Sequence, residues 1–68
     1  MLEEAIEKYR KIVVSYPLSP EAEQAQFQIA KIYDKFLKEA RKAESEYQKY
    51  ILRYPQGKFV SDAREKIK

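Results

Sequence analysis

The chain has 68 residues, a net charge of +3, and neither cysteine nor histidine. This composition allows one small domain and excludes disulfides, the usual Cys/His zinc sites, a cysteine nucleophile and a Ser-His-Asp triad. One glycine and three prolines are too few for an all-β protein with many tight turns, and no apolar run is long enough to span a membrane. We therefore expect a single all-α domain over residues 1–68, with no catalytic site, cofactor, metal or small-molecule substrate.

The first two predicted helices flank a Tyr-Pro break. Residues 2–16 carry apolar side chains at the period of one helical face, and Pro17 should end this helix because its nitrogen cannot donate a hydrogen bond. Ser19 before Pro20 is typical of a helix start, with serine as the N-cap. A second helix is predicted over residues 20–36. Its apolar side chains cover a wide arc that runs to Phe36, which indicates a helix in contact with neighbours on two sides.

Two more helices follow, over residues 39–54 and 58–68. Pro55 should end the first of them, and the narrow apolar stripe of the second suits an end helix with one face in water. The boundary at residues 34–39 contains neither glycine nor proline, so two structures are open. A continuous helix from 20 to 54 would be about 52 Å long and would have to swap or pair with another molecule. We expect a turn instead.

The Tyr-Pro pair occurs at residues 16–17 and again at 54–55, which is 38 residues later (54 − 16). The same shift superposes identical residues on the apolar stripes, such as Tyr9 on Tyr47 and Ala25 on Ala63. Val14 and Leu52 also correspond, off the stripes, as contacts to a neighbour on the convex face or as scattered surface residues. A period between about 20 and 50 residues predicts a solenoid of stacked units.

These repeated residues resemble the tetratricopeptide repeat family, whose helices carry small and aromatic residues at fixed positions and end at a proline. The matching positions are Ala5, Tyr9, Ile12, Tyr16, Pro17, Ala25, Ile29, Ala30, Tyr33, Ala43, Tyr47, Tyr50, Tyr54, Pro55, Ala63 and Ile67. The spacing is longer than the family's usual period of about 34 residues, and the turn at 34–39 lacks a glycine. The longer unit is similar to a bacterial envelope subgroup exemplified by the outer-membrane-assembly lipoprotein and the periplasmic cell-division coordinator.

The resemblance implies a non-catalytic scaffold that binds another protein or peptide on its concave face. By this resemblance the groove residues are Gln24, Phe27, Lys31, Asp34, Lys35, Asp62 and Glu65. Phe27 could instead be a core residue, and the two lysines could be solvated surface residues. The chain would begin in the middle of a repeat, as a fragment or a designed minimal unit does. The uncovered edge of its first helix predicts a homo-oligomer. The chain carries no signal peptide, and the resemblance implies the bacterial periplasm or envelope, with the cytoplasm as the alternative.

Other functions have weaker support in the sequence. Basic residues around the predicted turn could bind nucleic acid or an anionic surface: Lys31, Lys35, Lys38, Arg41 and Lys42. Acidic residues are interleaved with the basic ones, so we do not expect a nucleic-acid partner. The carboxylate pairs, such as Glu44 and Glu46, are poor catalytic candidates because nothing apolar is expected around them. A designed or truncated repeat without an evolved partner also fits.

Overall fold

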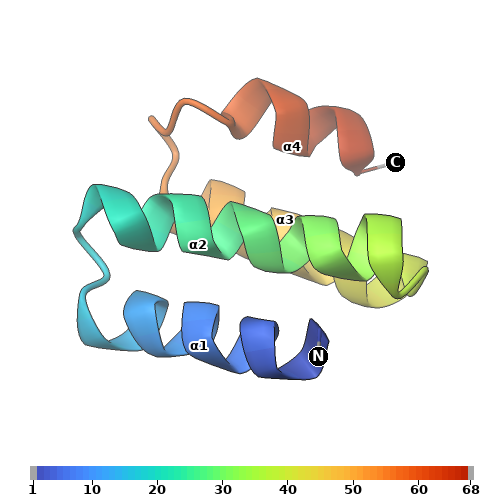
Figure 1. Cartoon of the computed structure of the whole chain (residues 1–68). Coiled ribbons are helices and arrows are strands. Elements are labelled where there is room, and N and C mark those ends of the chain that lie inside the picture. The colour runs from blue at the N-terminus through green and yellow to red at the C-terminus, as the bar shows by residue number, and fades with distance from the viewer. Residues whose placement is uncertain (1, 68) are drawn as a thin grey trace.

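The chain folds into an array of antiparallel helices, as the computed structural model shows for residues 2–67 (Figure 1). The elements are α1 (Leu2–Ser15), α2 (Pro20–Lys31), a π-helical turn (Ile32–Phe36), α3 (Ala40–Arg53) and α4 (Val60–Lys66). The described residues contain no β-strand. The predicted all-α fold with four helices is therefore confirmed, and α2 together with the π-helical turn covers the predicted range 20–36.

Helices that follow each other in the sequence pack against each other. α2 and α3 form an antiparallel hairpin, α1 packs against α2, and α4 packs against α3. In Figure 1, α1 and α4 therefore lie on opposite sides of the central hairpin. Because α2 itself packs against both α1 and α3, its apolar arc is wide.

The predicted start of α2 is confirmed at Ser19. The Ser19 hydroxyl oxygen accepts a hydrogen bond from the Ala22 amide at 3.0 Å, and Pro20 occupies the first helical turn. The same hydroxyl donates to the Tyr16 carbonyl at 2.8 Å. One side chain thus satisfies a free amide of α2 and fixes the turn after α1.

The turn between α2 and α3 is confirmed, although no glycine forms it. After the π-helical turn, the Glu39 amide donates to the Tyr33 carbonyl at 2.9 Å. Lys38 between them has a φ of +57°. This left-handed conformation is the one that glycine usually provides after a helix. Lys38 therefore supplies the chain reversal at the cost of strain.

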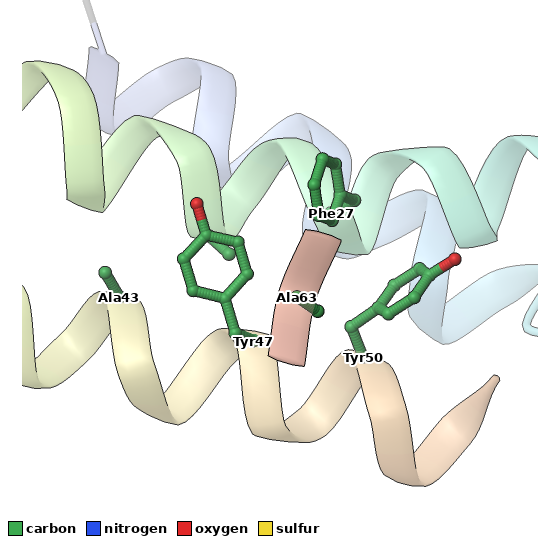
Figure 2. Close-up of a cluster of buried hydrophobic side chains, with 6 residues drawn as sticks. Phe27, Ala43, Tyr47, Tyr50 and Ala63 are labelled. Carbon is green, nitrogen blue, oxygen red and sulfur yellow. The ribbon is translucent and has the colours of Figure 1, made fainter. Parts of the chain in front are cut away.

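The core consists of two clusters that share α2. One contains Phe27, Ala30, Ala43, Tyr47, Tyr50 and Ala63, and the other contains Ile6, Ile29 and Ile32. Figure 2 shows the Tyr47 and Tyr50 rings extending from α3 toward α2, which carries Phe27. Alanines at the crossings let the helices approach closely. The repeated small and aromatic residues therefore form the packing of the hairpin.

Two large residues predicted on the packed stripes lie at the surface. Phe36 is 67% exposed, because the wider π-helical turn rotates it away from the face that carries Ile29 and Ile32. Tyr16 is also 67% exposed. Its counterpart Tyr54 is half-buried, and its hydroxyl donates to the Pro17 carbonyl at 2.9 Å in the turn before α2. No such turn precedes α1 in the described residues, so Tyr16 has nothing equivalent to pack on.

The remaining differences are at helix ends. α1 ends at Ser15 rather than at residue 16, and α3 is one residue shorter at each end than the predicted 39–54. α4 begins at Val60 rather than at residue 58 and ends at Lys66, and Ile67 is extended. Residue 68, the predicted end of this helix, lies outside the described residues.

Substituting Lys38 by glycine should stabilise the protein. Because a left-handed non-glycine residue costs about 1–2 kcal/mol, partly offset by the greater freedom of glycine in the unfolded chain, we expect a gain of about 0.5–1 kcal/mol in the free energy of unfolding. Urea denaturation followed by circular dichroism measures it. The matched control, Lys11→Gly inside α1, should lose about 1 kcal/mol. A loss at Lys38 of the same size as at Lys11 would contradict the left-handed turn.

Candidate protein-binding groove

A groove of about 250 Å³ runs between α2 and α4, with α3 beneath it. It is lined by Phe27, Lys31, Lys35, Tyr47, Asp62, Glu65 and Lys66. Five of the seven residues predicted for the concave face therefore line this one groove. Tyr47 and Lys66 were not among the predicted groove residues.

The floor of the groove is aromatic and belongs to the core. The Phe27 ring stacks on Phe59 with centroids 4.5 Å apart and lies 5.7 Å from the Tyr47 ring and 5.5 Å from the Tyr50 ring. Phe27 is only 6% exposed. It therefore serves first as a core residue, and only its rim is available to the groove. The Lys31 ammonium lies 6.0 Å from the centroid of this ring, within the range of a cation–π contact.

The walls of the groove differ in charge. Lys31 and Lys35 lie on the side of α2 and its π-helical extension, whereas Asp62 and Glu65 lie on α4. Lys66 adds one positive charge at the α4 side. A ligand that carries both an acidic and a basic group would find a partner on each wall.

The other two predicted residues lie elsewhere. Gln24 lines a separate hollow between α1 and α2, together with Tyr9 and Ile12. Asp34 accepts a hydrogen bond from the Tyr47 hydroxyl at 3.1 Å and borders a shallow hollow next to Arg41. Burial and the neighbouring Asp34 carboxylate raise the pKa of Tyr47. Tyr47 therefore remains a hydrogen-bond donor, and Asp34 helps to hold the floor of the groove in place.

The position of α4 depends on a hydrogen-bond network that the sequence did not reveal. The Tyr50 hydroxyl donates to Glu23 at 2.7 Å, and the same carboxylate oxygen accepts from the Lys58 amide at 2.9 Å. The Phe59 amide in turn donates to the Tyr50 oxygen at 3.0 Å. Burial raises the pKa of Tyr50 to about 12, with a further contribution from its hydrogen bond to Glu23. A side chain at Gly57 would clash with the Tyr50 hydroxyl, so this close approach requires glycine.

A second polar network joins α1, α2 and α3 and corrects our view of Glu46. Glu46 is buried, and it accepts hydrogen bonds from Gln26 at 2.9 Å and from Arg10 at 3.1 Å. Burial alone would raise the pKa of Glu46, but the hydrogen bonds from Gln26 and Arg10 and the charges of Arg10 and Lys49 lower it overall. Both carboxylate oxygens are thus engaged in structure. Gln26 and Glu46 each directly precede a core aromatic residue in the sequence. This position was the one sequence feature that could have indicated their burial.

The basic residues considered for nucleic acid do not form a uniform surface. Lys31 and Lys35 face the acidic residues of α4 across the groove. The Lys42 ammonium lies 3.4 Å from the Glu39 carboxylate and over the Tyr33 ring. Arg41 borders the hollow that also contains Asp34 and Glu44. The positive charges are interleaved with acids in space as they are in the sequence.

Consecutive antiparallel helices that pack pairwise through small and aromatic residues define a helical-hairpin repeat protein. A family model described as "Tetratricopeptide repeat" matches residues 24–57, which is half of the chain and covers most of the α2–α3 hairpin. The chain belongs to the tetratricopeptide repeat family. Comparison with curated proteins and with solved structures gave no match.

Repeats of this family generally mediate contacts between proteins and are typically non-catalytic. Within residues 2–67, no helix is long and apolar enough to cross a membrane. The same residues contain no group of three or more acidic side chains placed to hold a metal ion.

The Glu46 network predicts a specific pH dependence. The pKa of Glu46 is lower in the folded chain than in the unfolded chain, where it is near 4.5. The ionised carboxylate therefore stabilises the fold fully above pH 4.5, and this stabilisation is lost as the pH falls through the folded pKa. At pH 7, Glu46→Gln should lose about 1–3 kcal/mol of stability. Between pH 5 and pH 3, in urea titrations, its stability should fall less steeply than that of the unmodified protein.

Glu7→Gln removes the same charge on the exposed face of α1, outside this network, and is the matched control for the change in net charge. A Glu46→Gln variant with the pH slope of the unmodified protein would show that Glu46 has no lowered pKa in the folded state.

Proposed function

We propose that the chain is a protein-binding module that holds a peptide segment of a partner in the groove between α2 and α4. The observation that carries this proposal is the convergence of five residues from two helices on one groove, over an aromatic floor. These residues are separated by up to 38 positions in the sequence (65 − 27), and only the repeat packing brings them together. A groove of about 250 Å³ is small, so it suits a few side chains of a peptide.

The charge pattern specifies the peptide. An acidic side chain or terminal carboxylate would pair with Lys31 and Lys35, and a basic side chain would pair with Asp62 or Glu65. Between them, an apolar side chain would contact the exposed rim of Phe27. We therefore propose a peptide in which an apolar residue lies between one acidic and one basic residue.

Selection from a random peptide library displayed on phage tests this proposal. We expect the enriched peptides to carry the acidic–apolar–basic pattern, and we expect Lys35→Glu to weaken their binding about tenfold or more in fluorescence anisotropy. Lys11→Glu reverses the same charge on α1, outside the groove, and should leave the affinity within about twofold. Peptides that bind both variants equally would exclude the groove as the binding site.

We also propose that copies of the chain associate weakly, because large apolar side chains are exposed near one end of α1. Val14 is 71% exposed and Leu18 in the following turn is 97% exposed, and Leu52 on α3 is 81% exposed. Large exposed apolar side chains favour contact with another protein surface. Val14 and Leu52 correspond in the repeat, so each unit contributes one of them.

Light scattering across protein concentration tests self-association. We expect the mean mass to rise toward that of a dimer as the concentration approaches about 1 mM, which corresponds to a weak interaction of about 4 kcal/mol. Leu18→Glu should shift the rise to higher concentration, whereas Gln56→Glu, an exposed residue in the α3–α4 turn, should not. A strict monomer at all concentrations would contradict the proposal.

The spacing of 38 residues supports a proposed kinship with the longer repeats of the bacterial envelope subgroup. The segment after Tyr-Pro takes part in packing, since the Tyr54 hydroxyl reaches the Pro17 carbonyl. A sequence tree of homologues in which the chain groups with repeats of the ordinary length would contradict this kinship.

A further inference from the structure

α1 and α3 present the same pair of residue types to solvent. Lys11 and Val14 are exposed on α1, and Lys49 and Leu52 are exposed at the corresponding positions of α3. In each pair the two residues are three positions apart, so they are neighbours on the helix surface. None of the four belongs to the core clusters, so packing of the core does not account for their recurrence. We refer to these four residues as the outer face.

The exposure of the outer face does not depend on which units precede or follow. α1 of the earlier unit lies beside α3 of the later one, because Arg10 bonds to Glu46 at 3.1 Å. Val14 is 71% exposed although the later unit is in place next to it. Leu52 is 81% exposed although the earlier unit is in place next to it. The position is therefore open with a neighbouring unit on either side.

The segments that carry the outer face contain basic residues and no acidic ones. These segments are residues 8–18, in the second half of α1 and its turn, and residues 47–56, in the second half of α3 and its turn. Their basic residues are Lys8, Arg10, Lys11, Lys49 and Arg53. This separation of charge differs from the region around the α2–α3 turn, where acids and bases alternate.

Two acidic residues from outside these segments lie close to the outer face. Glu46 is buried and pairs with Arg10 at 3.1 Å and with Lys49 at 3.6 Å, so the three groups together keep one positive charge. Glu7 lines a hollow of about 460 Å³ on α1, which Arg10, Lys11, Val14 and Ser15 also line. Within residues 2–67, Lys11 and Arg53 form no ion pair. The outer face thus keeps a positive charge next to its apolar side chains.

We propose that the outer face binds peripherally to a lipid bilayer that contains anionic lipids. Val14 and Leu52 would enter the boundary between headgroups and acyl chains, and Lys11 and Arg53 would contact the headgroup phosphates. Leu18 extends this apolar surface, since it is 97% exposed in the α1–α2 turn. That turn and the α3–α4 turn lie at the same end of the molecule, opposite the α2–α3 turn (Figure 1).

A bilayer suits this surface better than a peptide or a second copy of the chain. Ligands of defined shape bind in concave pockets, whereas Val14, Leu18 and Leu52 project from the helices and the turn. In a symmetric dimer, the basic residues of the two copies would face and repel each other. This repulsion would keep the proposed self-association weak. An anionic bilayer can instead contact the apolar and the basic side chains at once.

Sedimentation with lipid vesicles tests this proposal. We expect the protein to sediment with vesicles of phosphatidylglycerol and phosphatidylcholine in equal parts, but not with vesicles of phosphatidylcholine alone. Raising the salt concentration from about 0.1 M to 1 M shortens the screening length from about 10 Å to 3 Å and should release most of the protein. The same salt should strengthen self-association, because it screens the repulsion between copies.

Charge variants locate the contact. Lys11→Gln combined with Arg53→Gln should weaken binding to the anionic vesicles at least about tenfold, because both residues would lie at the lipid surface. Lys31→Gln combined with Lys35→Gln gives the same net charge but changes the α2–α4 groove, and should leave vesicle binding within about twofold. The second pair should weaken the binding of groove peptides, whereas the first should not. Failure of either proposal can therefore be told from failure of the other.

A single tryptophan reports insertion, since the chain contains none. Emission from Leu52→Trp should shift to shorter wavelength on anionic vesicles and be quenched by lipids with brominated acyl chains. Phe36→Trp replaces another exposed residue, in the π-helical turn at the opposite end of α2, and should show neither effect. Circular dichroism establishes that all variants are folded.

Equal sedimentation with neutral and anionic vesicles would overturn the proposal, as would equal losses from the two pairs of charge variants. Quenching of Phe36→Trp but not of Leu52→Trp would place the contact at the α2–α3 turn and would also overturn it. An emission shift of Leu52→Trp that follows protein concentration and ignores vesicles would show that a second copy covers this surface instead.

Discussion

The packing of the Phe27 ring is the interaction on which the rest of the structure depends. Its stacked contact with Phe59, at 4.5 Å between centroids, and its tilted contacts with Tyr47 and Tyr50 connect α2 with α3 and with the segment that starts α4. Aromatic pairs of this kind contribute about 0.5–1.5 kcal/mol each beyond the area that they bury. A domain of 68 residues has little other core to rely on. The same ring also forms the floor of the proposed binding groove, so the stability of the hairpin and the shape of the groove have one origin.

Polar groups complete this packing, because each tyrosine hydroxyl in the core has a defined acceptor. Tyr47 donates to Asp34, and Tyr50 donates to Glu23, which also accepts from the amide of Lys58. No buried side-chain polar atom among the described residues lacks a hydrogen-bond partner. Since an unsatisfied buried polar group costs about 1–3 kcal/mol, these networks determine where the α3–α4 turn and then α4 must lie. The acidic wall of the groove is therefore positioned by Tyr50 and Glu23, which do not line it.

Features that depend on the period of the apolar residues could be predicted from the sequence, whereas features that depend on one neighbouring side chain or one local turn could not. Apolar spacing and the two Tyr-Pro pairs were sufficient to predict the helices, the turn and the repeat. They could not predict the exposure of Phe36, because a π-helical turn changes the direction of a side chain without changing the pattern of residue types. Gln26 and Glu46 were missed for a related reason. Each is an ordinary polar residue by type, and only the approach of α2 to α3 buries one against the other. Most predicted groove residues do line one groove, but Asp34 supports Tyr47 from outside it.

The groove between α2 and α4 and the hollow between α1 and α2 lie on corresponding surfaces of the two repeat units. On α3, Phe27 covers this surface, and beside it lies the charged groove that we propose as the peptide site. On α1, the corresponding side chains Tyr9 and Ile12 are half-buried. Lys8 lies on α1 at the position that Glu46 occupies on α3, so the hydrogen bond that Gln26 donates within the hairpin has no acceptor at the corresponding position of α1. The two units therefore share their apolar positions and differ in the polar position beside them.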